Sequence, residues 1–176
     1  MKANDIVIPV KLDEKTFKRF CRFDTLKLRR RWVRPVVFAL ILTAFAAVAL
    51  ATRREQSGMI AAVLLAVGLG LPLVYFGTFL SQVNLQAAQR RLKPARAVYT
   101  VRLNWEGVQV TNDQKKEEPV RLKWSEVQAA FRARGCVYLY VNAARAFLLP
   151  DGQASVSPEA LWAYLVKHMG AKARKA

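Results

Sequence analysis

The sequence predicts an α+β membrane protein, in which a hairpin of two transmembrane helices is joined to a domain of antiparallel strands. Three observations lead to this class. Two long segments, 35–52 and 56–89, contain no charged residue. From residue 98 onward, apolar and polar residues alternate in short runs. The chain has 29 Lys and Arg against 12 Asp and Glu, a net charge of +17, yet 53% of its residues are hydrophobic. This combination favours a protein at an anionic membrane surface over a soluble protein.

The two uncharged segments have the length that a membrane requires. A helix needs about 20 apolar residues to cross the hydrocarbon core, and spans are expected at about 34–52 and 58–81, within a hairpin of residues 33–93. Core helices of soluble proteins rarely stay uncharged on every face over such lengths. Because only the pentapeptide RREQS separates the segments, the two helices should be antiparallel neighbours with both chain ends on one side.

Positive residues flank the expected hairpin at its open end, whereas its turn contains only Arg53 and Arg54. Lys and Arg are retained on the cytoplasmic side of a membrane. The sequence therefore predicts a multi-pass protein of the inner (cytoplasmic) membrane with both termini in the cytoplasm. The residues expected to anchor the hairpin at the interface are Arg29, Arg30, Arg31, Trp32, Arg34, Arg90, Arg91 and Lys93.

The arginine-rich run at residues 27–35 has a second interpretation, as a nucleic-acid patch. A phosphate-binding patch does not need an apolar span that begins at its edge. Anionic lipid headgroups are therefore the expected partner of this run, and neither a nucleic acid nor a small-molecule substrate is expected.

Small residues recur at four-residue spacing within both spans, which predicts close packing of the two helices. They are Ala39, Thr43, Ala47 and Ala51 in the first span, and Ala62, Ala66 and Gly70 in the second. General alanine richness is the alternative explanation. Neither span contains an ionisable residue of the kind that ion pathways use, which argues against a transporter built from this chain alone.

Residues 1–32 are expected to form a strand and an interfacial amphipathic helix. Ile6, Ile8 and Val10 alternate with other residues as in a strand. Asp13 is placed to cap a helix, and Phe17 and Phe20 follow at helical spacing among Lys and Arg residues. Such a helix is expected to lie along the membrane surface.

Residues 98–176 are predicted to form a curled sheet or small barrel of six strands, closed by one helix. The helix should begin at Ser157, a good N-cap, with Pro158 in its first turn, and it should end at Gly170. The alternation predicts that Trp105 and Trp124 lie in the core, although ligand stacking is an alternative. Tyr138 and Tyr140 share one face, which either binds a partner or is covered by the helix.

Six strands followed by one amphipathic helix is the order of a pleckstrin-homology-like (PH-like) domain. The runs "WEGV" after the first strand, "LKWSEV" and "YLY…AFLLP" resemble the C-terminal domain of the YcxB-like family of bacterial membrane proteins. The resemblance implies a strand and a helix before two closely spaced spans, and it implies no catalytic residues. It also suggests that residues 5–10 join the sheet of the tail.

The residues themselves give no catalytic, metal or cofactor site. His168 has no acidic or thiol neighbour, and Cys21 and Cys136 are widely spaced, as in reduced thiols. Two functions remain. The first is a non-enzymatic, membrane-anchored PH-like module that binds a protein, peptide or lipid headgroup, with Arg132, Arg134 and Arg145 as candidate contacts or merely solvated charges. The second is an accessory subunit of a larger membrane transporter or envelope complex. A protein partner or a homo-oligomer fits either function.

Overall fold

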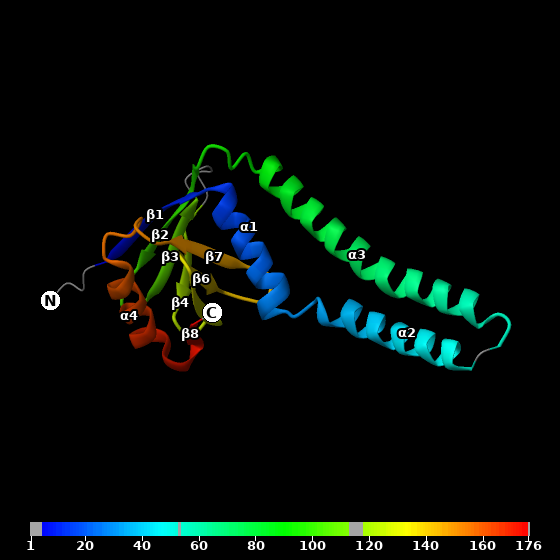
Figure 1. Cartoon of the computed structure of the whole chain (residues 1–176). Helices are drawn as coiled ribbons and strands as arrows, with labels where there is room; N and C mark the ends of the chain where they lie inside the picture. Colours follow the sequence, from blue (N-terminus) through cyan, green and yellow to red (C-terminus); the bar gives the residue numbers. More distant parts are fainter. Residues whose placement is uncertain (1–4, 53, 113–117, 176) are drawn as a thin grey trace. The chain divides into compact units, whose positions relative to one another are not determined.

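The computed structural model describes residues 5–52, 54–112 and 118–175, and its two compact units are shown in Figure 1. The hairpin unit comprises residues 21–90. The sheet unit comprises the chain before and after it, residues up to Phe20 and from Arg91. The fold is α+β, with two long apolar helices in one unit and two sheets in the other.

The hairpin unit consists of a short π-helix, η1 (Phe23–Leu28), and two α-helices, α2 (Val33–Ala51) and α3 (Ser57–Gln89). Every residue of α2 beyond Arg34 is uncharged, and α3 has no charged residue at all. Thr43 and Thr78 donate their hydroxyl hydrogens to the carbonyls of Ala39 and Val74 in the preceding turn, at 2.8 and 2.9 Å. These two hydroxyl groups are thus satisfied within their own helices.

The helices pack through small residues, but not through the predicted stripes. Ala46, Ala61 and Gly68 are buried, whereas Ala47 and Ala62 are exposed. Thr43, Ala51 and Ala66 are exposed as well, so the predicted four-residue spacing was wrong. Four residues turn an α-helix by about 40° more than a full circle, since each turn takes 3.6 residues, and such a stripe winds off the contact. The buried positions Ala61 and Gly68 lie seven residues apart, close to two full turns.

Gly68 and Gly70 provide a matched test of this packing. A Cβ atom on Gly68 would lie 3.1 Å from Leu42 Cβ, whereas one on Gly70 would meet nothing within 4 Å. We expect Gly68→Leu to destabilise the hairpin by about 1–3 kcal/mol, as overpacking of a close contact does, and Gly70→Leu to change little. Thermal midpoints of the two purified full-length variants in mild detergent measure the difference. Equal midpoints would contradict the assigned contact face.

The sheet unit contains eight strands in two four-stranded sheets. The order is β1-β2-β3-β4 in the first sheet and β7-β6-β5-β8 in the second. All neighbours are antiparallel except β5 and β8, which are parallel. The strands are β1 (Ile6–Leu12), β2 (Arg96–Leu103), β3 (Gly107–Asn112), β4 (Val120–Lys123), β5 (Ala129–Ala133), β6 (Cys136–Tyr140), β7 (Ala146–Pro150) and β8 (Ala173–Lys175).

The first strand comes from the segment before the hairpin, and it pairs with the strand that follows the hairpin. β1 and β2 pair from Ile6 opposite Leu103 to Leu12 opposite Arg96, with a register shift between Val10 and Lys11. This confirms the prediction that the N-terminal strand joins the sheet of the tail. The outer edge of β1 is closed by the segment after β7: Ser155 Oγ accepts a hydrogen bond from Val7 N at 3.2 Å, and Gln153 Oε1 accepts one from Lys11 N at 2.7 Å.

The core of the sheet unit is apolar and draws on both sheets. Its largest fully buried side chains are Ile8, Val10, Val101, Leu103, Val108, Val127, Val137, Leu139, Leu149, Leu161 and Leu165. Tyr99 of β2 links the first sheet to β7, since its hydroxyl accepts a hydrogen bond from Leu148 N at 2.8 Å and donates one to Leu148 O at 3.1 Å.

Helix α4 (Pro158–Met169) begins and ends as predicted. Ser157 Oγ accepts a hydrogen bond from Ala160 N at 3.2 Å, and Gly170 follows the helix with a φ of 54°, which favours glycine. Leu161, Leu165 and Met169 form its buried stripe. After α4, a single 3₁₀ turn, η2 (Gly170–Lys172), leads into β8. β8 was not predicted from the sequence, because three residues are too few to show an alternation.

The prediction that Trp105 lies in the core was wrong. Its side chain is 68% exposed, because β2 ends at Leu103 and Trp105 lies in the turn before β3. Asn104 Oδ1 accepts hydrogen bonds from the backbone N of Glu106 and Gly107, which fixes this turn. Gly107 is required there: a Cβ on it would lie 1.9 Å from Leu122 O. Trp124, by contrast, is half-buried and donates its indole hydrogen to Asn104 O at 3.0 Å.

Candidate functional site

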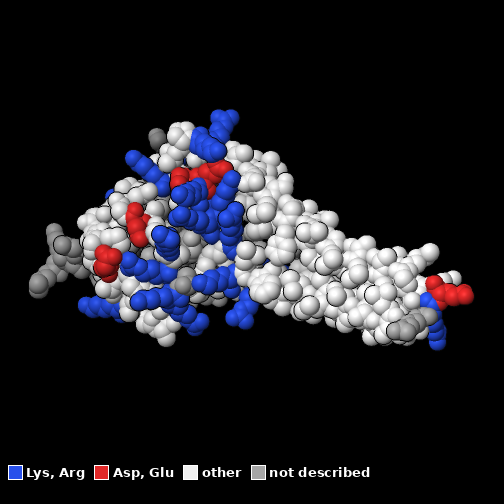
Figure 2. Space-filling model, in the orientation of Figure 1, with Lys and Arg blue, Asp and Glu red and all other residues white. Residues whose placement is uncertain are grey.

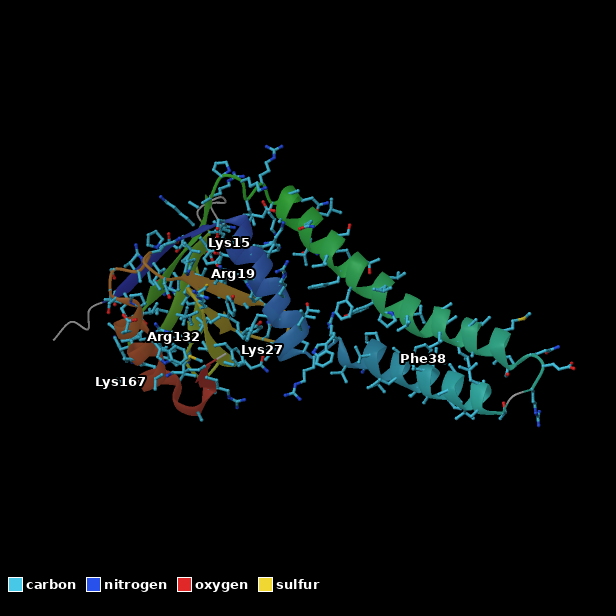
Figure 3. The ribbon with its side chains drawn as sticks, viewed as in Figure 1. Lys15, Arg19, Lys27, Phe38, Arg132 and Lys167 are labelled. Atoms are coloured by element: carbon cyan, nitrogen blue, oxygen red, sulfur yellow. The ribbon has the colours of Figure 1, made fainter. Side chains whose placement is uncertain are left out.

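The largest exposed apolar surface among the described residues lies on α2 and α3. Side chains such as Leu40 (64% exposed), Met59 (73%) and Leu73 (73%) are open. Figure 3 shows mainly carbon atoms along both helices, with Phe38 labelled on α2, and Figure 2 shows no charge between the base of the hairpin and its turn. A monomeric soluble protein rarely leaves so much contiguous apolar surface in water. This surface needs an apolar partner, either lipid or other helices.

Both helices are long and apolar enough to cross a membrane, on length and composition alone. In the most apolar window of each helix, only 6% of α2 and 11% of α3 is buried. The apolar core helix of a soluble protein would be mostly covered by other residues. The two helices are therefore compatible with a membrane hairpin.

Six of the predicted interfacial residues belong to the hairpin unit, and all six are exposed: Arg29, Arg30, Arg31, Trp32, Arg34 and Arg90. Arg29 Nε lies 2.9 Å from Asp24 Oδ2. Trp32 donates its indole hydrogen to Leu26 O at 3.0 Å, which fixes the indole just before the start of α2. Exposed arginines and one tryptophan thus lie together at the N-terminal end of the apolar helix α2.

Arg91 and Lys93 belong to the sheet unit. Lys93 Nζ lies 3.0 Å from Glu14 Oε2, and Lys18 forms a second ion pair with Glu14 on helix α1 (Glu14–Arg22). Hydrogen bonds from these two ammonium groups hold the pKa of Glu14 below its usual range. Glu14 is thus a carboxylate at neutral pH, and it partly neutralises the cations beside it.

The three candidate partner contacts have different roles. Arg132 Nη1 donates to Pro158 O at 2.8 Å, and its Nη2 lies 3.3 Å from Glu159 Oε1, so this side chain ties β5 to the start of α4. Arg145 lies over the ring of Phe147, 5.1 Å from its centroid. Arg134 is exposed in the turn before β6. Among the described residues, no hydrogen bond or ion pair links the three.

The aromatic face of Tyr138 and Tyr140 is covered, and the element that covers it is α1. Both tyrosines are buried, and the ring of Phe20 lies 5.2 Å from Tyr138 in an edge-on contact and 6.2 Å from Tyr140. Phe17 is buried too. The phenylalanines that were expected at the membrane surface therefore pack on the sheet. The sequence predicted the C-terminal helix as a possible cover of the two tyrosines, whereas the helix whose ring contacts them is α1.

The described residues contain no group of three or more His, Cys, Asp and Glu that could hold a metal ion, and no buried polar or charged residue. His168 stacks on Trp124 with ring centroids 5.0 Å apart, and its Nδ1 lies 2.9 Å from Tyr164 O. Burial raises the pKa of the Cys136 thiol to about 12, so this thiol stays protonated and unreactive at neutral pH. These groups stabilise the fold rather than offer a reactive centre.

An open groove of about 970 Å³, which was not predicted from the sequence, lies beside β4 and is lined by residues 104–109 and 121–126. Trp105 is its most exposed aromatic residue. The positive charges of Arg121 and Lys123 in the groove are equal in number to the negative charges of Glu106 and Glu126. Glu126 Oε2 accepts the hydrogen bond of Lys123 N at 2.8 Å, which blocks part of the β4 edge for an added strand. The Asn and Gly of "NWEG" are the turn signal that would have placed Trp105 outside the core.

Comparison with known proteins identifies no relative: no family model, no curated protein and no solved structure matches the chain.

Substitution of Arg132 and of Arg134 compares an arginine that stabilises the fold with one that is exposed in a turn. We expect Arg132→Ala to destabilise the sheet unit by about 1–3 kcal/mol, because it removes the donor to Pro158 O. The contact with Glu159, whose side chain is 79% exposed, adds little. Arg134→Ala should stay within about 0.5 kcal/mol of wild type, as exposed sites do. Denaturant unfolding of the full chain, followed by hydrogen exchange in the first turn of α4, measures both. A larger effect at Arg134 would contradict these roles.

Proposed function

We propose that α2 and α3 cross the inner membrane of a bacterium and hold the sheet unit at its cytoplasmic face, where the sheet unit acts as a non-enzymatic interaction module. The observation that carries this proposal is the exposure of apolar side chains on both helices along their whole length. Lipid tails would cover this surface without any further protein.

The lengths of the helices support the proposal. The 19 residues of α2 reach about 28 Å at 1.5 Å per residue, close to the hydrocarbon thickness of about 30 Å. The 33 residues of α3 reach about 50 Å, so its more polar end, from Ser81 to Gln89, would extend beyond the bilayer. Trp32 and the arginines around it would then lie at the interface, where indoles and cations are favoured.

Strand pairing supports the proposed topology independently of charge. Leu12 of β1 lies opposite Arg96 of β2, and these residues flank the segment that contains both helices. Two segments that share a sheet must lie on the same side of a membrane. A hairpin that leaves and returns between them has to cross twice. The cations at its open end, against two in its turn, are our reason to propose that this side is the cytoplasm.

The strand order supports a PH-like domain. Seven strands, β1 to β7, followed by a helix is the PH-like order, here with β1 separated from β2 by the hairpin and with the short strand β8 added after α4. With the "WEGV" and "LKWSEV" runs, this arrangement is our reason to propose membership of the YcxB-like family. The partner of such a module would be a protein, a peptide or a lipid headgroup. The groove beside Trp105 and the exposed Arg134 are candidate contacts.

A second candidate function is favoured by one observation on the hairpin. The small residues Ala47, Ala51, Ala62 and Ala66 remain exposed, although they are of the type that lets helices approach closely in lipid. They would fit the helices of another subunit, as in an accessory protein of a transporter or envelope complex, or in a homo-oligomer. The mass of the particle extracted with mild detergent separates a monomeric module from a subunit.

Cysteine accessibility in intact cells tests the topology. Full-length variants lacking Cys21 and Cys136 would carry one new cysteine, either Gln56→Cys in the hairpin turn or Ala163→Cys on α4; both positions are exposed. A membrane-impermeant maleimide should label position 56 in intact cells, and position 163 only after permeabilisation, because the two would lie on opposite sides.

Denatured samples of both variants, labelled to completion, serve as the control for expression and reactivity. Labelling of position 163 from outside would reverse the proposed orientation. Protection of position 56 before permeabilisation, together with release of the protein by carbonate, would refute membrane insertion.

A further inference from the structure

Helix α1 has one apolar side that is used by the fold and one basic side that is not. Phe17 is buried and Phe20 packs on Tyr138, with ring centroids 5.2 Å apart. Lys15, Arg19 and Arg22 follow at intervals of four and three residues, which places them on one face of the helix. All three are exposed. The helix is therefore held in place by its aromatic residues while it presents a row of cations.

The acidic residues near this row have other hydrogen-bond and ion-pair partners. Hydrogen bonds with Thr16 lower the pKa of Asp13, and within the row only the charge of Lys15 adds to this effect. Glu14 pairs with Lys18 and with Lys93. Asp13 accepts a hydrogen bond from Thr16 N at 3.1 Å and caps the helix. Among the described residues, no ion pair engages Lys15, Arg19 or Arg22. Figure 2 shows Lys and Arg atoms concentrated over α1, and Figure 3 labels Lys15 and Arg19 on this helix.

We infer that Lys15, Arg19 and Arg22 form an electrostatic docking surface for anionic phospholipid headgroups. The inference rests on the proposed function. Only η1 and Arg29–Trp32 separate α1 from α2 along the chain. If α2 begins at the membrane surface, the covalent connection keeps α1 within reach of the headgroup layer. Lysine and arginine near an anionic surface are attracted to it without insertion of apolar side chains.

This mode of binding differs from that of an interfacial amphipathic helix. Such a helix buries its apolar face in the bilayer, but Phe17 and Phe20 of α1 are committed to the sheet unit. The contact made by α1 would therefore depend on charge alone. It should weaken with salt, because exposed charges are screened within about 8 Å at physiological ionic strength.

The sheet unit offers a matched control. Arg102 of β2, Lys167 of α4 and Lys175 of β8 are three exposed cations of the sheet unit, and none of them lines the groove beside Trp105. A triple variant of these residues to Gln removes as much charge as Lys15→Gln, Arg19→Gln and Arg22→Gln do together. A nonspecific effect of net charge would be the same in both variants.

The experiment measures lipid binding to the full-length protein in non-ionic detergent by native mass spectrometry. Phosphatidylglycerol is titrated against phosphatidylcholine and against inorganic phosphate in parallel arms. We expect the apparent affinity of the salt-sensitive sites for phosphatidylglycerol to fall about a hundredfold in the α1 variant, which is about fivefold for each cation removed. The sheet variant should bind as wild type does.

A conservative variant, Lys15→Arg with Arg19→Lys and Arg22→Lys, keeps the charge and should bind as wild type does, which controls for folding. Equal losses in the α1 and sheet variants, unchanged binding in the α1 variant, or equal binding of inorganic phosphate would each overturn the inference. Carbonate extraction of wild type is run alongside. Release of the wild-type protein would refute membrane insertion itself, whereas retention with unchanged lipid binding would refute only the role of α1.

Discussion

The pairing of β1 with β2 is the constraint on which the rest of the structure depends. It joins residues 6–12 to residues 96–103, and the whole hairpin lies between them in the chain. Without this ladder, β2 would become an edge strand of its sheet, and Ile8 and Val10 would leave the core. The same ladder requires that the hairpin leave the sheet unit and return to it. The sheet unit therefore requires an even number of crossings of any membrane that the helices enter.

The sheet unit blocks parts of its own strand edges. Ser155 and Gln153 bond to the outer backbone of β1, and β8 covers β5 with Lys172 Nζ donating to Ser125 O and Val127 O at 3.1 and 3.0 Å. Glu126 occupies the Lys123 N–H of β4. Exposed strand edges invite association with other chains. Since the edges of β1 and β4 are partly occupied, recognition there is expected to use side chains, namely the groove at Trp105 and the cations of α1.

The sequence alone was sufficient where a pattern had a single physical explanation. The start of α4 followed from Ser157 and Pro158, and the long helices followed from the absence of charge. The predicted position of residues 5–10 in the sheet came from the family resemblance, because an alternating pattern predicts a strand but does not indicate which other strand it pairs with. Trp105 was misplaced because alternation was extended beyond the end of β2, into a turn that Asn104 and Gly107 define. The apolar side of α1 was expected to face the membrane because an amphipathic helix packs equally well on lipid or on a sheet, and only the tertiary contact of Phe20 with Tyr138 distinguishes them.

A disulfide formed across the β1–β2 ladder in native membranes would test the central constraint most directly. Val7 lies opposite Arg102, and its N–H and C=O bond to Ser155 rather than to β2, so the two residues form a non-hydrogen-bonded pair. Such pairs have Cα atoms about 4.5 Å apart, within disulfide range. In full-length protein with Cys21→Ser and Cys136→Ala, Val7→Cys should crosslink rapidly with Arg102→Cys under mild oxidant, and poorly with Thr100→Cys, two residues out of register. Crosslinking to position 100 in preference to 102, or to neither in membrane-embedded protein, would contradict the account.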